Sequence, residues 1–335
     1  MKFLFIIISI ILFSGCSNQP DVKKPPKPLP QWIHSTLPFD TQRTLYGMSI
    51  GEDREEAIKL ALVDMVSKLG IQIESTFESI SKETKYSYYS NSKSYIKSSI
   101  SKIKINNYKV IKSHKISYRE FAVMIEVDRN KFKNGLIENY NLKMNNILLT
   151  LKNLKNENAL NKYNLQKLAY LKSEKLIPTI LIIHELDKSF DKNKELKKID
   201  NLHSNFFKFK NNLSFFISGN KKSYKFNNVL KNHLSSMGFN ISEKKSNSIN
   251  ILVEVNDHLI EEYVDTNIKN AQINITRIHL EFKVFDNLTL IGGKELIIKE
   301  RFKNNVNSVY KNAVLSFEKD IKSKNINDLI GLNLK

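Results

Sequence analysis

The chain has 335 residues, enough for about two domains, and its hydrophobic content of 41% is too high for a disordered chain. Its net charge of +19 comes almost entirely from lysine, whereas nucleic-acid sites favour arginine for bidentate contacts with phosphates and bases. We therefore expect a solvated basic surface and no nucleic-acid partner. The single cysteine excludes both an intramolecular disulfide framework and a cysteine-based metal site.

The first sixteen residues read MKFLFIIISIILFSGC. Lys2 is followed by an apolar run from Phe3 to Phe13. This run has the length of a secretory signal and is too short to span a bilayer. The small residues directly before Cys16 resemble a bacterial lipobox, in which the cysteine is acylated, for example with palmitate, and becomes the mature N-terminus. We predict a signal peptide over 1–15 and lipidation at Cys16. The alternative is an ordinary signal peptide with a chance cysteine.

A proline-rich segment over 16–38 follows the predicted lipidation site. It favours extended polyproline II, so we expect a stiff tether between a membrane and the folded part. Ser17, directly after the cysteine, resembles the sorting signal of an outer-membrane lipoprotein, and we expect the chain in the bacterial outer membrane. The prolines of the segment are Pro20, Pro25, Pro26, Pro28, Pro30 and Pro38.

The next segment, over 39–130, predicts a small domain with one helix on a sheet. Gly47 and Gly51 allow a tight turn or a close backbone approach. The following helix is predicted over 53–69, ended by Gly70, with a strand beginning at Ile71. Two further strands are predicted within 103–127. The apolar face of the helix comprises Ile58, Ala61, Leu62, Met65, Val66 and Leu69.

Three features of this region together resemble the LPP20-type lipoprotein family. They are Trp32 after the tether, YGMSIG at 46–51, and the helix sequence EEAIKLALVDMVSKLGIQIES, and the resemblance covers about 31–130. It implies a small α+β domain shared with flagellar-associated envelope proteins, and it supplies no catalytic residues. Trp32 is expected to start the first strand or to pack at the domain edge.

A polar stretch over 78–101 is rich in Ser, Tyr and Lys. Tyrosines among small polar residues suit adaptable contacts with a protein partner. The candidate partner-binding residues are Tyr86, Tyr88, Tyr89 and Tyr95. The alternative is a long hairpin or helical excursion with half-buried rings.

The segment over 131–190 predicts a helical linker. Leu and Ile at helical spacing indicate two helices that turn near 156–158, and Pro178 would bend or end the second helix. We expect a hairpin that joins two domains; a coiled-coil partner site is the alternative.

A second α+β domain is predicted over 191–335. Its elements are a strand at 213–217, a helix at 226–237 ended by Gly238, a buried strand at 250–255, a hairpin of 273–285 with 288–300, and a final helix from Val306 to Ile321. Gly292 and Gly293 allow a bulge in the hairpin. The fold class is therefore α+β, with two small helix-on-antiparallel-sheet domains joined by a helical hairpin.

No pattern in the chain points to catalysis. No HExxH, GxSxG or phosphate-loop motif occurs, and no two histidines stand at the spacing of a helical metal pair. The acidic residues from Glu254 to Asp265 are expected to balance the basic surface; a cation site is the alternative. We expect no enzyme, no metal and no cofactor other than the covalent lipid on Cys16.

These observations favour a lipid-anchored outer-membrane lipoprotein that acts by binding. It would be a structural or assembly factor of the cell envelope, linked to the flagellum or to adhesion, with envelope proteins or a second copy of itself as partners. An oligomeric secretion or assembly module is one alternative, and an envelope hydrolase is another.

Overall fold

The computed structural model describes residues 28–35, 38, 40–83, 105, 107–265, 271–302 and 306–334. Cys16 and the candidate tyrosines lie outside the described residues, so those sites stay predictions. The described part forms two compact units, one within 1–65 and 108–126 and the other within 66–107 and 127–335.

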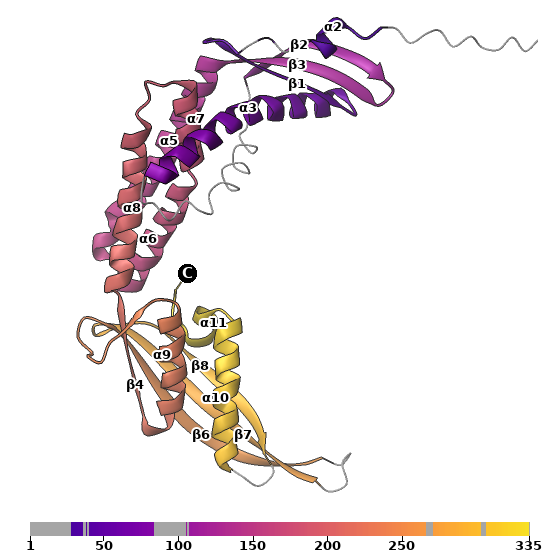
Figure 1. The fold of residues 1–335 in the computed structure, drawn as a ribbon. Coiled ribbons are helices and arrows are strands. Elements are labelled where there is room, and N and C mark those ends of the chain that lie inside the picture. Colours follow the sequence, from indigo (N-terminus) through magenta and orange to yellow (C-terminus); the bar gives the residue numbers. More distant parts are fainter. Residues whose placement is uncertain are drawn as a thin grey trace, which may run out of the picture. The chain divides into compact units, whose positions relative to one another are not determined.

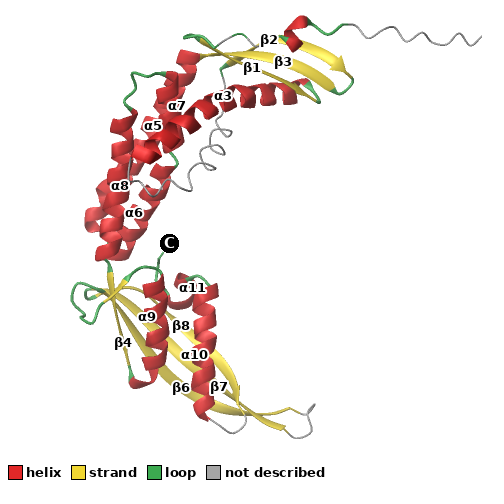
Figure 2. Cartoon of the chain, in the orientation of Figure 1, coloured by secondary structure: helices red, strands yellow, loops and turns green. Residues whose placement is uncertain are grey.

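The described elements are α-helices, β-strands and short 3₁₀ helices, written η. Figure 1 labels most of the helices and strands, and Figure 2 colours helices and strands differently. In chain order they are α2 (Gln31–His34), β1 (Thr44–Gly51), α3 (Arg54–Glu83), β2 (Tyr108–Ser117), β3 (Glu120–Asp128), α5 (Arg129–Lys152), η2 (Asn153–Asn156), α6 (Ala159–Glu174), α7 (Ile177–Leu186), α8 (Lys192–Asn212), β4 (Ser214–Gly219), η3 (Lys221–Ser223), α9 (Tyr224–Ser236), β5 (Asn240–Ile241), β6 (Ile249–Asp265), β7 (Ala271–Asp286), β8 (Thr289–Phe302), α10 (Val306–Ser323) and α11 (Ile326–Ile330). The predicted α+β class is confirmed.

The N-terminal unit is built around a sheet of order β1-β3-β2, with the start of α3 along one face (Figure 1). The helix approaches β1 very closely. A Cβ added at Gly47 would lie 2.0 Å from the carbonyl oxygen of Ala61, and one at Gly51 would lie 2.5 Å from the backbone nitrogen of Ala57. The predicted close backbone approach at these two glycines is therefore confirmed.

The helix α3 continues through Gly70 to Glu83, so the predicted helix end and the strand from Ile71 are wrong. A glycine inside a helix costs only about 1 kcal/mol relative to alanine. The apolar residues Val66, Leu69, Ile73, Phe77 and Ile80 keep helical spacing across it. That periodicity outweighs one glycine.

Trp32 does not begin a strand. It lies in the short helix α2, half-buried, with the ammonium of Lys112 on β2 at 5.9 Å from the centre of its ring. The alternative expectation, packing at the domain edge, agrees with this position.

Four successive helices, α5 to α8, precede the sheet of the second unit in the chain. The predicted turn near 156–158 is confirmed, because Asn158 begins α6 by accepting a hydrogen bond from the backbone of Asn161 at 2.9 Å. The predicted hairpin is too short, however, since α7 and α8 follow. Pro178 stands in the first turn of α7. The N–H groups of a first turn have no acceptor within the helix, so a proline, which lacks this group, can begin a helix there. The expected helix end at Pro178 is therefore a helix start.

Hydrogen bonds join α5 to α7 and to α8. Arg129 donates to the backbone carbonyls of Leu186 at 3.1 Å and Glu185 at 3.0 Å, at the C-terminal end of α7. Tyr140, only 2% exposed, donates its hydroxyl to Glu195 of α8 at 2.5 Å. Burial, and then the neighbouring carboxylate, raise the pKa of Tyr140, so this phenol keeps its proton.

The C-terminal sheet has the order β5-β4-β6-β7-β8. It is mixed, because β4 pairs in parallel with β5 and β6 while β6, β7 and β8 pair antiparallel, so the expected purely antiparallel sheet is wrong. The helix α9 lies between β4 and β6 in the chain and provides the crossover that a parallel pair needs. The predicted bulge is confirmed by a register shift at Val284, opposite Gly292.

The helices α9, α10 and α11 cover one face of this sheet (Figures 1 and 2). The core between them contains Phe226, Phe282 and Phe317, each at most 1% exposed. The N-terminal end of α6 contacts this sheet, because the backbone N–H of Ala159 donates a hydrogen bond to the carboxylate of Asp286 on β7 at 2.7 Å. Within the described part of the chain, no helix is long and apolar enough to cross a membrane.

His203 on α8 is a buried titratable group, only 6% exposed, with the Tyr170 ring edge-on at 4.6 Å. Loss of hydration lowers the pKa of His203 to about 4. Below pH 6.5 the unfolded chain protonates this imidazole while the folded chain does not. The free energy of unfolding is therefore expected to fall as the pH drops from about 6.5 to 4, by about 3 kcal/mol for this residue.

Urea denaturation of the wild type and of His203→Leu across that pH range measures this contribution. The variant is expected to lose that part of the pH dependence, whereas His34→Gln, at an exposed histidine, is expected to keep it. Equal slopes in the wild type and His203→Leu would contradict the prediction.

Candidate functional site

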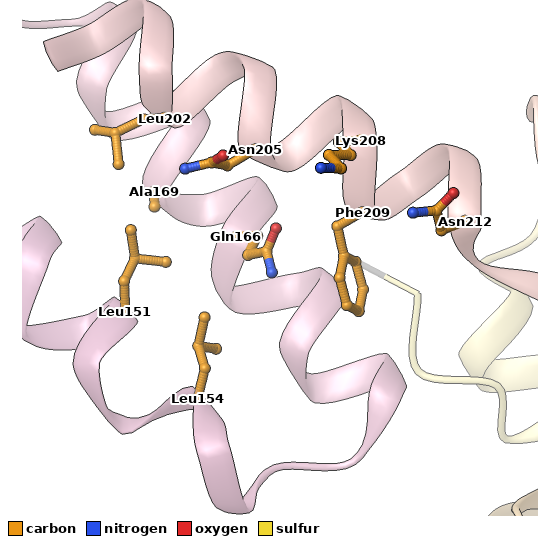
Figure 3. Close-up of a pocket in the computed structure, with 9 residues that line it drawn as sticks. All are labelled: Leu151, Leu154, Gln166, Ala169, Leu202, Asn205, Lys208, Phe209 and Asn212. Atoms are coloured by element: carbon orange, nitrogen blue, oxygen red, sulfur yellow. The ribbon is translucent and has the colours of Figure 1, made fainter.

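A pocket of about 390 Å³ lies among the helices of the second unit, between the end of α5, α6 and α8 (Figure 3). Its wall comprises Leu151, Leu154, Gln166, Ala169, Leu202, Asn205, Lys208, Phe209 and Asn212. Its volume is near the lower end of the range for small-molecule sites, about 300 to 1,000 Å³.

One wall of this pocket is formed by side chains that lie on one face of α8. Leu202, Asn205, Phe209 and Asn212 follow at intervals of three or four residues, so they share one stripe, and Lys208 lies beside it. This stripe runs next to the fully packed face of α8, which includes Ile199.

Facing α8, Gln166 and Ala169 lie one turn apart on α6, while Leu151 and Leu154 come from the end of α5 and from η2. Figure 3 shows Phe209 extending from α8 between the helices and Leu151 and Leu154 rising from the opposite side. The side chains that reach into the pocket interior are therefore mostly apolar.

The polar residues of the pocket lack partners within the described part of the chain. The side-chain oxygen of Gln166 is buried and accepts no hydrogen bond. The exposed side chains of Asn205, Lys208 and Asn212 form no hydrogen bond or ion pair with any described residue. A buried acceptor without a donor costs about 1 to 3 kcal/mol, so such groups are usually satisfied by water or a ligand.

The described lining of the pocket is made of apolar side chains, amide side chains and one lysine. Lys208 is the one ionisable residue among the lining side chains, and no serine, cysteine, histidine or carboxylate stands beside it. Nucleophilic or acid–base catalysis needs such a second group within hydrogen-bond reach. Among the residues that the structure describes, no group of three His, Cys, Asp or Glu side chains is arranged to hold a metal ion.

A second hollow, of about 630 Å³, lies on the β6–β8 part of the sheet, and several of its charged side chains contact one another. Glu281 stands opposite Glu254 on one side and Glu295 on the other. The ammonium of Lys283 contacts Glu281 at 3.0 Å and Glu254 at 3.3 Å, and these hydrogen bonds raise the pKa of Lys283. The imidazole of His279 lies 2.6 Å from Glu295.

In this second hollow Lys283 and His279 contact carboxylates, and Lys294 donates to the backbone carbonyl of Asp328. Glu254 is a member of the acidic segment identified in the sequence, and here it faces a lysine. The side chains of that segment from Asp257 to Asp265 lie outside the described ones.

The sequence-predicted sites and the pocket do not coincide. Cys16 and the four tyrosines fall outside the described residues, whereas every pocket residue lies within 151–212. The sequence carried a signal for the wall formed by α8, because Asp191 caps that helix and Leu196, Ile199 and Phe206 repeat at helical spacing. The helix was not predicted, because many Asn and Lys residues lie between these apolar residues and weaken the hydrophobic pattern.

No family model matches the chain, and no curated protein matches it. Similar solved structures include the secreted protein HP1454 from Helicobacter pylori, 12% identical, covering 84% of this chain and 99% of that chain with a TM-score of 0.43. A minor lipoprotein from Acinetobacter baumannii is 12% identical, with 33% and 94% covered and a TM-score of 0.23. A protein described as a neuraminyllactose-binding hemagglutinin homologue from Helicobacter pylori is 15% identical, with 36% and 90% covered and a TM-score of 0.24.

The first of these neighbours is described as a secreted protein and the second as a lipoprotein. At such identities and TM-scores they carry no conclusion about the function of this chain.

Proposed function

We propose that the chain is a lipid-anchored outer-membrane protein of the LPP20 type that acts by binding, as a structural or assembly factor of the cell envelope. The observation that carries the proposal is Cys16, the only cysteine, which directly follows small residues at the end of the apolar run Phe3 to Phe13. Each buried CH₂ of an acyl chain contributes about 0.8 kcal/mol, so several chains hold a protein on a membrane durably.

Two further observations support this function. The proline-rich segment over 16–38 suits a spacer between the membrane and the folded units. The pocket among α5, α6 and α8 offers a place to bind a ligand and lacks a nucleophile–base pair. A binding role fits that lining better than a hydrolase does.

The anchor is tested by Cys16→Ala in a bacterial host that receives labelled palmitate. The wild type and the matched control Ser14→Ala, which keeps a small residue before the cysteine, are expected to incorporate the label and to stay in the outer-membrane fraction. Cys16→Ala is expected to lose both. A Cys16→Ala variant that stays labelled and fully membrane-bound would overturn the proposal.

A further inference from the structure

We infer that the pocket among α5, α6 and α8 binds a small amphiphilic carboxylate that carries an N–H donor next to its charge, the chemistry of an N-acylated amino acid. This inference rests on the proposal that the protein acts by binding, and it names the ligand class. It does not depend on the lipid anchor.

The size and the interior of the pocket define the apolar part of the ligand. Leu151, Leu154, Leu202 and Phe209 offer side chains from two sides of a space of about 390 Å³. A space of this volume accepts one small molecule. An apolar ring or short alkyl chain gains about 25 cal/mol for each Å² that it buries there.

The charge at the pocket defines the ligand's head group. Among the described residues that line the pocket, Lys208 is the only charged one, and no described carboxylate pairs with it. Asn205 and Asn212 lie about one turn to either side of Lys208 on α8, so each places an amide donor on the same stripe of the helix. The second hollow differs, because Lys283 there already contacts Glu254 and Glu281. In that hollow the ammonium of Lys294 also has an acceptor, the backbone carbonyl of Asp328. Of these three lysines, Lys208 in the pocket of Figure 3 is the one whose ammonium contacts no acceptor among the described residues.

The remaining requirement comes from Gln166. Its buried oxygen accepts no hydrogen bond from the described part of the protein. A ligand N–H would satisfy this acceptor, whereas a purely apolar ligand would leave it desolvated. Gln166, Asn205 and Phe209 all line this one pocket (Figure 3). One ligand can therefore contact the Gln166 amide, the Phe209 ring and the polar side chains of α8 together. An N-acylated amino acid has all three complementary parts.

N-acetylphenylalanine is the probe, titrated by calorimetry into the full chain purified in a maltoside detergent, with detergent alone as the blank. Two relatives each lack one feature: the methyl ester lacks the anion, and 3-phenylpropionate lacks the N–H. The ester is expected to bind at least about tenfold more weakly, since a hydrogen bond to a charged group contributes about 1.5 to 3 kcal/mol. 3-Phenylpropionate is expected to bind about fivefold more weakly, since a neutral hydrogen bond contributes about 1 kcal/mol.

Two variants assign the contacts. Lys208→Ala is expected to weaken binding of the acid about tenfold and to leave the ester unchanged, while Lys197→Ala, at an exposed and unpaired lysine on the same helix, is expected to change neither. Gln166→Met is expected to reduce the preference for N-acetylphenylalanine over 3-phenylpropionate. Far-ultraviolet circular dichroism checks that each variant is folded.

Absence of binding by the wild type, equal binding of the three probes, or equal effects of the two lysine variants would each overturn the inference. The failure of the lipid anchor is distinguishable, because it would show in the palmitate experiment and leave these titrations unchanged.

Discussion

Gly47→Ala is expected to lower the free energy of unfolding of the N-terminal unit by about 3 kcal/mol or more. The added methyl group would start 2.0 Å from the carbonyl oxygen of Ala61 and 3.0 Å from the Cβ of Met65. The nearest atom belongs to the helix backbone, so no side chain can rotate away to make room. Strand β1 and helix α3 would have to separate, which exposes a core that includes Leu45 and Ala61, both fully buried.

Urea denaturation followed by tryptophan fluorescence measures this loss, because Trp32 is the only tryptophan and lies in the same unit. Ile50→Ala is the matched control in the same strand, where the side chain is 44% exposed, and a smaller loss is expected. Gly135→Ala on α5 meets no atom within 4 Å and is expected to stabilise its helix by about 0.5 to 1 kcal/mol. A Gly47→Ala midpoint equal to that of the wild type would contradict the close approach.

The same residues show what a sequence can and cannot predict about the N-terminal unit. Gly47 and Gly51 alternate with larger residues on a strand and precede a helix with Ala57 and Ala61, so the local pattern predicts close packing. The helix end predicted at Gly70 was wrong, because a glycine near the end of a helical pattern resembles a C-terminal cap. Only the longer window, through Ile80, distinguishes a cap from an interior glycine.

The candidate pocket could not be predicted, because it depends on how helices pack. Gln166 and Phe209 are far apart in the sequence, and each alone is an ordinary residue of an amphipathic helix. Their meeting requires α7 and α8, and the sequence interpretation took Pro178 as a helix end. A proline in the first turn of a helix and a proline that breaks one look alike without the hydrogen bonds around them.

The strand pairing of the C-terminal sheet also needed the structure. The segments at 213–217 and 250–255 were predicted as strands, and a helix between them was predicted as well. Strand, helix and strand in that order permit a parallel pair, but short apolar runs do not reveal their partners. In the structure the partners run from Phe215 with Ile249 to Gly219 with Val253, so the two strands are parallel.

Phe317→Ala is expected to cost about 3 to 5 kcal/mol of the stability of the C-terminal sheet and its helices. Phe317 on α10 is fully buried, and its ring centre lies 5.8 Å from those of both Phe226 on α9 and Phe282 on β7. The first pair meets edge-on at 68°, and the second is stacked at 18°. Removal of the central ring would leave a cavity that borders two helices and the sheet.

Two measurements test this prediction: urea denaturation followed by circular dichroism, and hydrogen exchange of the β7 amides, whose protection is expected to fall with the stability of the unit. Leu315→Ala is the matched control, because it lies two residues away on α10 and is 54% exposed. Its expected change is within about 0.5 kcal/mol, as for other surface substitutions. Similar losses for the two variants would mean that α10 packs on the sheet through a different face, and the predicted role of Phe317 would be wrong.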